Sequence, residues 1–155
     1  MNTQAHLDDA SLLLDNQLCF KLYAASRAVI RAYKPMLDQL NLTYPQYLAM
    51  LVLWEWQVKA PEQPTVKALG ERLLLDSGTL TPLLKRLEQL GFVSRQRSVR
   101  DEREVHIQLT EAGSQLREHV LPLRNELLCL HGAEEDEMVA LRQNLAQLLQ
   151  RFVTS

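Results

Sequence analysis

The sequence predicts a mainly α-helical fold with one small β-hairpin. Apolar residues fill 46% of the 155 positions and are mostly leucine, while aromatic residues and glycine are scarce. This balance favours leucine-packed helices over a β-sandwich. Most of the chain carries apolar residues at helical spacing, and only residues 92–97 and 104–109 alternate as strands do. The length suits a single globular domain.

The N-terminal part predicts two helices. Apolar residues recur at helical spacing through residues 10–40, and we expect Pro35 to bend or end this first helix because it lacks a backbone donor. Residues 41–42 predict a break. A second helix is predicted to begin at Thr43, because Thr43 and Gln46 have the spacing of a capping box.

A helix-turn-helix is predicted next. After a proline-containing loop at 58–64, Thr65 can cap a short helix, and residues 76–79 form a turn rich in N-cap residues. The following helix has one leucine face and ends at Gly91, in the usual place after a helix. We expect Pro82 in its opening turns, where a missing donor costs little. The leucines of that face are Leu80, Leu83, Leu84, Leu87 and Leu90.

A hairpin and two further helices complete the prediction. The two alternating segments flank a polar tip at residues 98–103. We expect Thr110 to cap a helix that reaches about Leu130 and bends at Pro122, and the acidic residues 134–137 to begin a last helix. That last helix is expected to bury Leu141, Leu145, Leu148, Leu149 and Phe152.

This order of elements describes a winged helix-turn-helix over residues 65–110. The second helix of such a unit lies in the major groove of DNA with its N-terminal residues toward the bases. An ordinary polar helix face is the alternative for the helix alone, and the hairpin directly after it favours DNA binding. Opposite the leucines, side chains able to bond base edges or phosphates are Ser77, Thr79, Thr81, Lys85 and Arg86, beside Pro82.

The charge distribution favours contact with DNA through one surface. A net charge of −2 argues against a protein that coats nucleic acid indiscriminately. Acidic residues collect toward the ends, at Asp8, Asp9, Asp15 and 134–137, whereas residues 85–100 are basic. A solvated charged face would explain this charge pattern alone. On the hairpin, we expect phosphate contacts, which give affinity and salt dependence, from Arg95, Arg97 and Arg100.

The hairpin tip carries an acidic and a basic residue two positions apart. The carboxylate of Asp101 can hold the guanidinium of Arg103 extended, and an ordered arginine suits the narrow minor groove of A·T-rich DNA. We therefore expect Arg103 to enter the minor groove.

A resemblance to the MarR family of transcriptional regulators is carried by the segment LGERLLLDSGTLTPLLKRLEQLGFVSRQRSVRDEREVHIQLTEAG. The Asp101-x-Arg103 wing, followed six residues later by Leu109-Thr110, is its most specific mark. The resemblance implies an obligate homodimer and an operator that is a short inverted repeat of double-stranded DNA. It makes residues 1–155 a single domain, in which residues 10–42 and 111–155 supply N- and C-terminal dimerisation helices.

Two further segments, LCFKLYAASRAVIRAYKPML and LTYPQYLAMLVLWE, resemble the organic-hydroperoxide-sensing OhrR branch of that family. The resemblance implies that Cys19 is the peroxide-reactive thiol. It also implies that Tyr33 and Tyr44, 14 and 25 residues after Cys19, bond to this thiol from the other subunit. Tyr23 and Tyr47 are nearby additions.

The chemistry of this site is sensible without the resemblance. The thiolate, rather than the thiol, attacks peroxide, and phenolic O–H donors favour the charged form without carrying charge themselves. Apolar neighbours could make a pocket that prefers organic hydroperoxides to hydrogen peroxide. The candidates for this pocket are Leu18, Phe20, Leu22 and Trp54.

Cys129 is the candidate resolving thiol. By resemblance, two-cysteine members of the OhrR branch carry their second thiol in the C-terminal third, where it is reached across the dimer. Oxidation would then end in an intersubunit disulfide between Cys19 and Cys129. No local motif marks Cys129, and a buried, inert cysteine is the alternative interpretation.

Two rival functions remain open. A MarR-type regulator could instead respond to a small aromatic ligand, and a thiol peroxidase could turn over Cys19 with Cys129, although the latter leaves the basic hairpin unexplained. We expect no enzymatic activity, no cofactor and no metal, since the histidines are scattered and no phosphate-binding loop is visible. The N-terminus lacks a secretory signal and no apolar run is long enough for a membrane span, so we expect a cytoplasmic protein.

Overall fold

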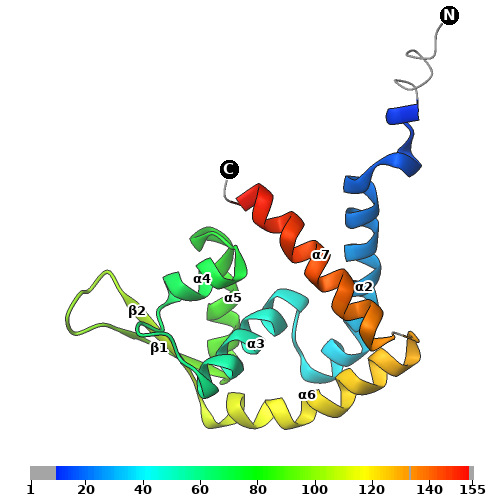
Figure 1. Ribbon diagram of the computed structural model, residues 1–155. Helices are drawn as coiled ribbons and strands as arrows, with labels where there is room; N and C mark the ends of the chain where they lie inside the picture. The colour runs from blue at the N-terminus through cyan, green and yellow to red at the C-terminus, as the bar shows by residue number, and fades with distance from the viewer. Residues whose placement is uncertain (1–9, 133, 154–155) are drawn as a thin grey trace, which may run out of the picture. The chain divides into compact units, whose positions relative to one another are not determined.

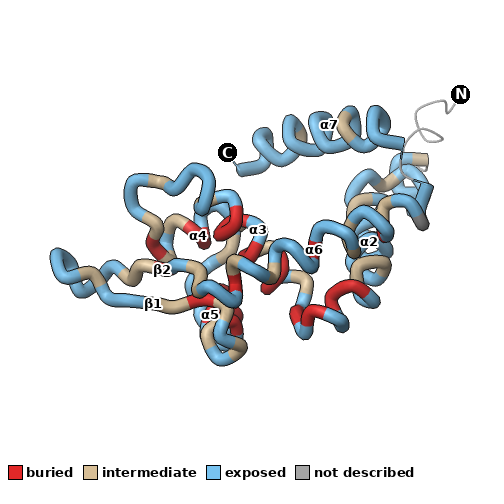
Figure 2. Tube along the Cα trace, turned by 90° about the horizontal axis from the view of Figure 1, so that it is seen from below, coloured by how far each residue is buried: buried red, intermediate tan, exposed pale blue. Residues whose placement is uncertain are grey.

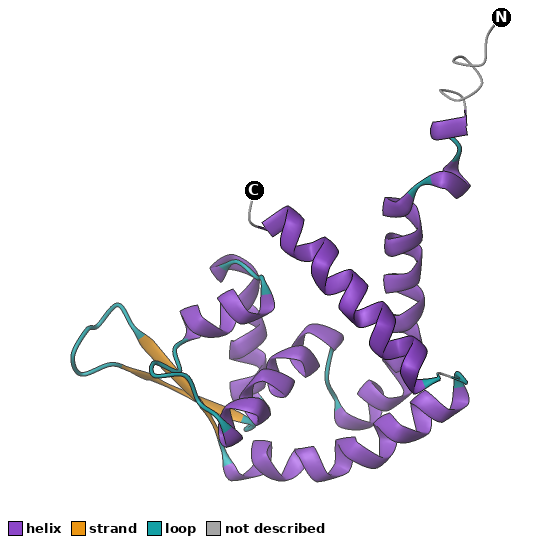
Figure 3. Ribbon diagram, viewed as in Figure 1, coloured by secondary structure: helices purple, strands orange, loops and turns teal. Residues whose placement is uncertain are grey.

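The elements follow the predicted order, and the described residues form helices and one hairpin (Figure 3). The computed structural model describes residues 10–132 and 134–153, so the predicted acidic positions Asp8 and Asp9 lie outside the described residues. The chain divides into two units, residues 1–117 and 118–155, which are treated separately below. The elements are η1 (Leu14–Asn16), α2 (Leu18–Leu40), α3 (Tyr44–Val58), α4 (Val66–Leu73), α5 (Ser77–Gln89), β1 (Val93–Arg97), β2 (Val105–Leu109), α6 (Glu111–Leu130) and α7 (Glu135–Val153).

The first helix is shorter than predicted, because α2 begins at Leu18 rather than near Ala10. Two polar side chains interrupt the segment before it. Asn16 donates to the carbonyl of Ala10 at 2.7 Å, and Gln17 donates to the carbonyl of Leu13 at 2.9 Å. Such side-chain bonds compete with the helical backbone pattern, and only the short η1 forms there.

Pro35 does not end α2, which continues to Leu40. Pro35 removes the helical donor for the carbonyl of Arg31, and both residues lie on the exposed side of α2. An ion pair of 2.9 Å between Lys34 and Asp38 spans the proline. The capping box predicted at the start of α3 is confirmed, with Gln46 N–H donating to Thr43 Oγ1 and Thr43 N–H donating to Gln46 Oε1.

The core of the first unit lies where α3, α4, α5 and the hairpin meet (Figures 1 and 2). The leucine face of α5 is buried as predicted at every position except Leu90, which is half-buried. Gly91 takes a positive φ of 79° just after α5, as expected for a residue that ends a helix. The largest fully buried side chains are Tyr47, Met50, Leu69, Leu80, Leu84, Leu87, Val93 and Ile107.

Pro82 lies in the second turn of α5, because α5 begins at Ser77, so the proline is within the opening turns of the helix as predicted. A proline at this position cannot donate to the carbonyl four residues before it, which is that of Gly78. That this proline costs little stays a prediction.

The hairpin pairs β1 with β2 in antiparallel register, from Val93 opposite Leu109 to Arg97 opposite Val105. The segment before α4 adds to its edge, because Thr65 bridges His106 and Ile107 N–H donates to the Pro64 carbonyl at 3.0 Å. This attachment fixes strand β2 of the hairpin to the helix-turn-helix.

The second unit holds the end of α6 and all of α7. The prediction that α7 buries its leucines is wrong for a single chain, since no described residue of α7 is buried (Figure 2). Exposed apolar residues of α7 are Met138, Leu141, Leu145, Leu149, Phe152 and Val153. No helix among the described residues is long and apolar enough to cross a membrane.

Candidate functional site

The start of α5 is held by a charged cap. Asp76 Oδ1 accepts a hydrogen bond of 2.8 Å from the Thr79 N–H. Hydrogen bonds from Thr79 lower the pKa of Asp76 below its ordinary value of 3.8. A carboxylate here also meets the positive end of the helix dipole. The first turn of the predicted recognition helix is thereby ordered in the absence of DNA.

The buried leucines of α5 leave its polar side open to solvent. All five predicted contact residues are exposed, and the Thr81 hydroxyl already donates to the Ser77 carbonyl at 2.8 Å. The structure therefore brings the predicted DNA-facing side chains of this helix together on one accessible surface. They are Ser77, Thr79, Thr81, Lys85 and Arg86.

The turn between α4 and α5 contains an unusual residue. Leu74 adopts the left-handed conformation, with φ 56° and ψ 38°, and 56% of its surface is exposed. This turn brings Gly70 close to α5, where a Cβ would lie 3.0 Å from the Leu75 carbonyl oxygen and 3.2 Å from the Leu80 Cδ2. The left-handed turn permits close packing of the two helices at a cost in backbone strain.

The hairpin arginines divide into two groups. Arg95 forms an ion pair with Glu88 of α5, through bonds of 3.0 and 2.7 Å to one carboxylate oxygen. Its guanidinium is therefore already engaged within the chain, which weakens the prediction that it contacts phosphate. Arg97 and Arg100 are exposed on the hairpin. The sequence did not indicate Glu88 as a partner, because nothing local links the end of a helix to a strand seven residues later.

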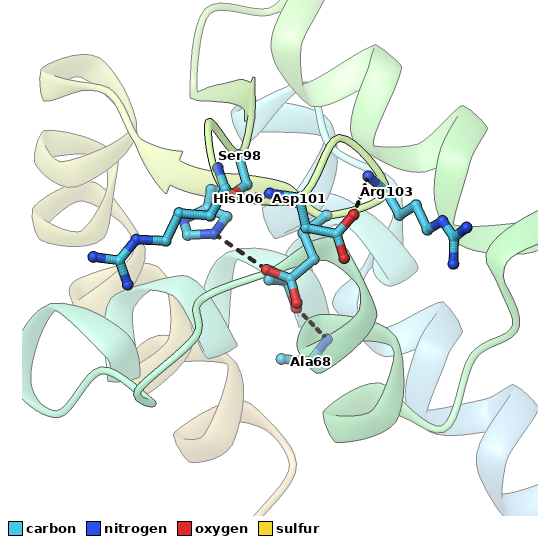
Figure 4. Close-up of polar contacts among 8 residues, drawn as sticks. Ala68, Ser98, Asp101, Arg103 and His106 are labelled. Atoms are coloured by element: carbon cyan, nitrogen blue, oxygen red, sulfur yellow. Dashed lines mark hydrogen bonds and ion pairs between the residues drawn. The ribbon is translucent and has the colours of Figure 1, made fainter.

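The acidic residue of the tip acts differently from the prediction. Asp101 Oδ1 accepts a 3.0 Å hydrogen bond from the backbone N–H of Arg103, not from its guanidinium (Figure 4). A short acidic side chain reaches the N–H two residues ahead more readily than a distant side-chain end. The Arg103 side chain extends away from this carboxylate and is exposed.

Cys19 is a free, exposed cysteine in the first turn of α2. The N-cap residue Gln17 makes no side-chain hydrogen bond to that turn. The backbone amide groups at the start of a helix have no intrahelical acceptor and carry partial positive charge. The alternative that Cys19 is buried filler does not hold for the single chain.

Three tyrosines cluster where α2 meets α3. The Tyr33 and Tyr44 ring centroids lie 5.5 Å apart at an interplanar angle of 74°, and the buried Tyr47 ring lies 5.8 and 6.2 Å from them. Burial, and then the neighbouring Tyr33, raise the pKa of Tyr44 above 10.0. Tyr44 therefore stays protonated and can donate a hydrogen bond at physiological pH.

The cluster lies far from Cys19 in the same chain. Tyr33 is 14 residues after Cys19 on one continuous helix, which corresponds to about 21 Å of rise. Tyr23 lies one turn after Cys19 and is exposed, with the Arg27 guanidinium 5.2 Å from its ring centroid. A single chain brings only Tyr23 near the thiol.

Trp54 does not belong to the predicted pocket. It is buried, and its Nε1 donates a 2.9 Å bond to the Gly113 carbonyl, so it packs in the core between α3 and the start of α6. The other predicted pocket residues lie on α2 beside Cys19, where Leu18 is exposed and Phe20 and Leu22 are half-buried.

Cys129 is also free and exposed, close to the end of α6 in the second unit. Its carbonyl accepts a 3.2 Å bond from Gly132, whose φ of 57° makes the turn toward α7. The alternative interpretation of Cys129 as a buried cysteine therefore does not apply to the single chain. Within residues 10–132 and 134–153, no three His, Cys, Asp or Glu side chains gather into a metal-binding group.

Known proteins resemble this chain over most of its length. A family model described as transcriptional regulator SarA/Rot matches residues 31–120. The organic hydroperoxide resistance transcriptional regulator of Bacillus subtilis (strain 168) is 51% identical over 137 residues, which are 88% of this chain and 90% of that protein. The chain belongs to the organic-hydroperoxide-resistance branch of the MarR family.

Solved structures of this MarR family show the same fold. AbfR of Staphylococcus epidermidis matches with a TM-score of 0.76 and 37% identity, over 96% of this chain and 99% of that one. Reduced AbfR bound to DNA matches with a TM-score of 0.74 and 38% identity, over 94% and 99% of the two chains. A disulfide-formed AbfR matches with a TM-score of 0.64 and 36% identity, over 98% and 100%. The chain is a winged-helix, DNA-binding transcriptional regulator.

Proposed function

We propose that this regulator is a homodimeric repressor that releases its operator when an organic hydroperoxide oxidises Cys19. The proposal is carried by one observation about α2. The exposed thiol of Cys19 lies in the first turn of this helix, and Tyr33, whose ring contacts that of Tyr44, lies about four turns further along it. The relatives support the hydroperoxide as the input, because one is an organic hydroperoxide resistance regulator and AbfR exists in reduced and disulfide forms.

The proposed sensing site is shared between two chains. The rigid span of α2 prevents Tyr33 and Tyr44 from reaching Cys19 of their own chain, so a second copy must supply these phenols. Tyr44 suits this role because it remains a protonated donor. Tyr23, one turn from Cys19, adds a donor from the same chain. Phenolic donors stabilise the thiolate that attacks peroxide.

The proposed oxidation proceeds in two steps, the formation of a sulfenic acid at Cys19 and its condensation with Cys129. The Cys19 thiolate attacks one peroxide oxygen, the O–O bond breaks, and the alkoxide leaves and takes a proton as the alcohol. The sulfur loses two electrons and becomes a sulfenic acid. The thiol of Cys129 in the partner subunit then attacks that sulfur, and a disulfide and one water molecule form. Both cysteines are exposed in the single chain, which supports their availability.

The proposed dimer would cover the exposed apolar faces at the two ends of the chain. Leu14, Leu18, Val29 and Ile30 near or on α2 are exposed, as are the leucines of α7. Contiguous apolar surfaces of this kind mark protein interfaces. Residues 10–42 and 111–155 would supply the interface, and the winged unit at 65–110 would remain free to bind DNA.

Each winged unit of the proposed dimer would bind one half of an inverted repeat. The exposed side of α5 would enter the major groove, with base or phosphate contacts from Ser77, Thr79, Thr81, Lys85 and Arg86. Arg103 would enter the minor groove, while Arg97 and Arg100 would meet phosphates. Arg95 makes a weaker candidate, since Glu88 already holds it.

The test compares wild type with Cys19→Ser and Cys129→Ser on an operator duplex that wild type selects from random-sequence DNA. We expect cumene hydroperoxide to release wild type and a thiol reductant to restore binding. Cys19→Ser should bind the operator and ignore the peroxide. Cys129→Ser should form the sulfenic acid without giving a disulfide-linked dimer on a non-reducing gel.

The rival functions give different results in the same experiment. Release of Cys19→Ser by the peroxide would contradict the thiol mechanism, whereas its release by a small aromatic compound would favour a ligand-responsive regulator. Sustained peroxide turnover coupled to a thiol reductant would favour a thiol peroxidase. Stoichiometric oxidation followed by arrest supports a sensor that is not an enzyme.

A further inference from the structure

The tip of the hairpin is ordered by its own side chains. The Ser98 hydroxyl oxygen accepts hydrogen bonds from the backbone N–H groups of Arg100 at 3.2 Å and Asp101 at 3.4 Å. Asp101 in turn accepts the Arg103 N–H at 3.0 Å, and its carbonyl accepts the Glu104 N–H at 3.0 Å. The side chains of Ser98 and Asp101 thus accept hydrogen bonds from three backbone N–H groups in a loop that projects from the sheet (Figure 1).

The loop is also closed at its base. Ser98 N–H donates to the Glu104 carbonyl at 2.8 Å, one position beyond the last paired residues of the strands, Arg97 and Val105. Ser98 therefore uses its backbone to continue the hairpin and its hydroxyl to fold the tip. Among residues 10–132 and 134–153, no other side chain accepts a hydrogen bond from the N–H groups of Arg100 and Asp101.

We propose that Ser98 is a positioning residue for DNA binding, which presets the tip so that Arg103 is presented to the minor groove. Two hydrogen bonds connect Ser98 to Arg103. The Asp101 N–H donates to the Ser98 hydroxyl oxygen, and the Arg103 N–H donates to the Asp101 carboxylate. Ser98 itself makes no base or phosphate contact in this proposal. It acts by fixing the backbone from which Arg103 extends.

The physical benefit is preorganisation. A flexible loop must lose conformational freedom when it binds, and that loss reduces affinity. A tip that already holds its bound shape avoids much of this loss. Because the effect is on loop order and not on charge, it changes affinity without changing the number of phosphates neutralised.

The inference rests on the proposed placement of Arg103 in the minor groove. The test uses the full-length chain and the operator duplex selected by wild type from random-sequence DNA. Ser98→Ala should raise the Kd for this duplex about fivefold to tenfold, the range expected when one or two groups must be ordered on binding. The slope of log K against log salt and the thermal unfolding temperature should stay those of wild type. Ser98→Thr, which keeps the hydroxyl, should restore the affinity.

A double-mutant cycle shows through which residue Ser98 acts. Because Ser98 positions Arg103, adding Ser98→Ala to Arg103→Ala should cause no further loss of affinity. An unchanged Kd for Ser98→Ala, or losses that multiply in the double variant, would overturn the inference. A salt slope reduced by one would also overturn it, since Ser98 would then bear on a phosphate contact. If Arg103→Ala binds the duplex as tightly as wild type, the proposed placement of Arg103 in the minor groove fails, independently of the result for Ser98→Ala.

Discussion

The indole Nε1 of Trp54 donates a 2.9 Å hydrogen bond to the carbonyl oxygen of Gly113, and this bond ties α3 to the first turn of α6. Next to it, Gln57 donates to the Ser114 hydroxyl at 2.6 Å. On its other side, the start of α6 lies close to the backbone of Phe92, which is possible because residue 113 has no side chain. A Cβ there would lie 2.0 Å from the Phe92 carbonyl oxygen, the residue before β1. The beginning of α6 is therefore locked against both α3 and the hairpin.

Gly113→Ala should destabilise the protein by about 2–4 kcal/mol, because the added methyl cannot fit beside the rigid Phe92 backbone. Denaturant unfolding measures this. Helix propensity alone predicts the opposite sign, a gain of about 1 kcal/mol for alanine over glycine. A stabilised variant would therefore show that the close approach is absent.

Leu74→Gly should stabilise the protein by about 1 kcal/mol, since glycine adopts the left-handed conformation of this turn without the steric cost that leucine bears. Leu74→Ala is the matched control, because it removes the exposed side chain but keeps the strain. Denaturant unfolding of both variants separates the two effects. Equal changes in the two would indicate that the side chain, and not the backbone, sets the stability.

Asp76→Ala should lower the thermal unfolding temperature near pH 7, with a difference from wild type that shrinks at low pH. The pKa of Asp76 is lowered in the folded state. Its contribution is therefore present above the unfolded value near 3.8 and is lost as the pH falls through the folded value. Asp76→Asn keeps an acceptor without the charge and should show less pH dependence. A gap that stays constant from pH 7 to pH 3 would contradict this role.

Arg95→Ala and Arg97→Ala should have opposite signatures. Arg95 pairs with Glu88, so its loss should cost about 1 kcal/mol of stability and leave the salt dependence of operator binding unchanged. Arg97 is exposed, so its loss should reduce the salt slope by about one for each phosphate contact removed and leave unfolding unchanged. Unfolding curves and binding titrations across salt concentrations distinguish the two. A reduced slope for Arg95→Ala would mean that DNA displaces Glu88.

Mixed dimers test the shared sensing site. One chain carries Cys19→Ser and the other carries Tyr33→Phe with Tyr44→Phe, and two affinity tags isolate the mixed pair. The thiol of the second chain then meets intact tyrosines from the first. Labelling of its sulfenic acid should be as fast as in wild type, and faster than in the homodimer that lacks both phenols. Equally slow labelling in both dimers would show that the phenols act within their own chain.

The sequence predicted the helix-turn-helix and the hairpin well, because their signals are local. Thr43, Thr65 and Thr110 all cap helices where expected, and Gly91 ends α5 with a positive φ. The start of the first helix was predicted wrongly because local rules compete there with side-chain hydrogen bonds. The bonds of Asn16 and Gln17 to backbone carbonyls interrupt the helical pattern, and α2 begins only at Leu18.

The candidate site was predictable only in part, because residue roles depend on contacts distant in sequence. Periodicity cannot show that Glu88 holds Arg95 or that Trp54 bonds Gly113. The side chain of Asp101 was predicted to act on the guanidinium of Arg103, and its geometry directs it to the backbone instead. The exposed leucines of α7 were predicted as core because a leucine stripe has the same pattern whether its cover is the same chain or another.

The length of α2 has a consequence for newly made protein. In the proposed mechanism, a chain that has not yet found its partner holds its thiol about 21 Å along the helix from Tyr33, out of reach of its own phenols. In this mechanism, an unpaired chain would bind only one half of the inverted repeat, and its Cys19 would lack the tyrosine donors that promote the reaction with peroxide. Chains synthesised during oxidative stress would then escape oxidation until they form dimers. The peroxide concentration at which the response begins would depend on the fraction of the regulator that is dimeric.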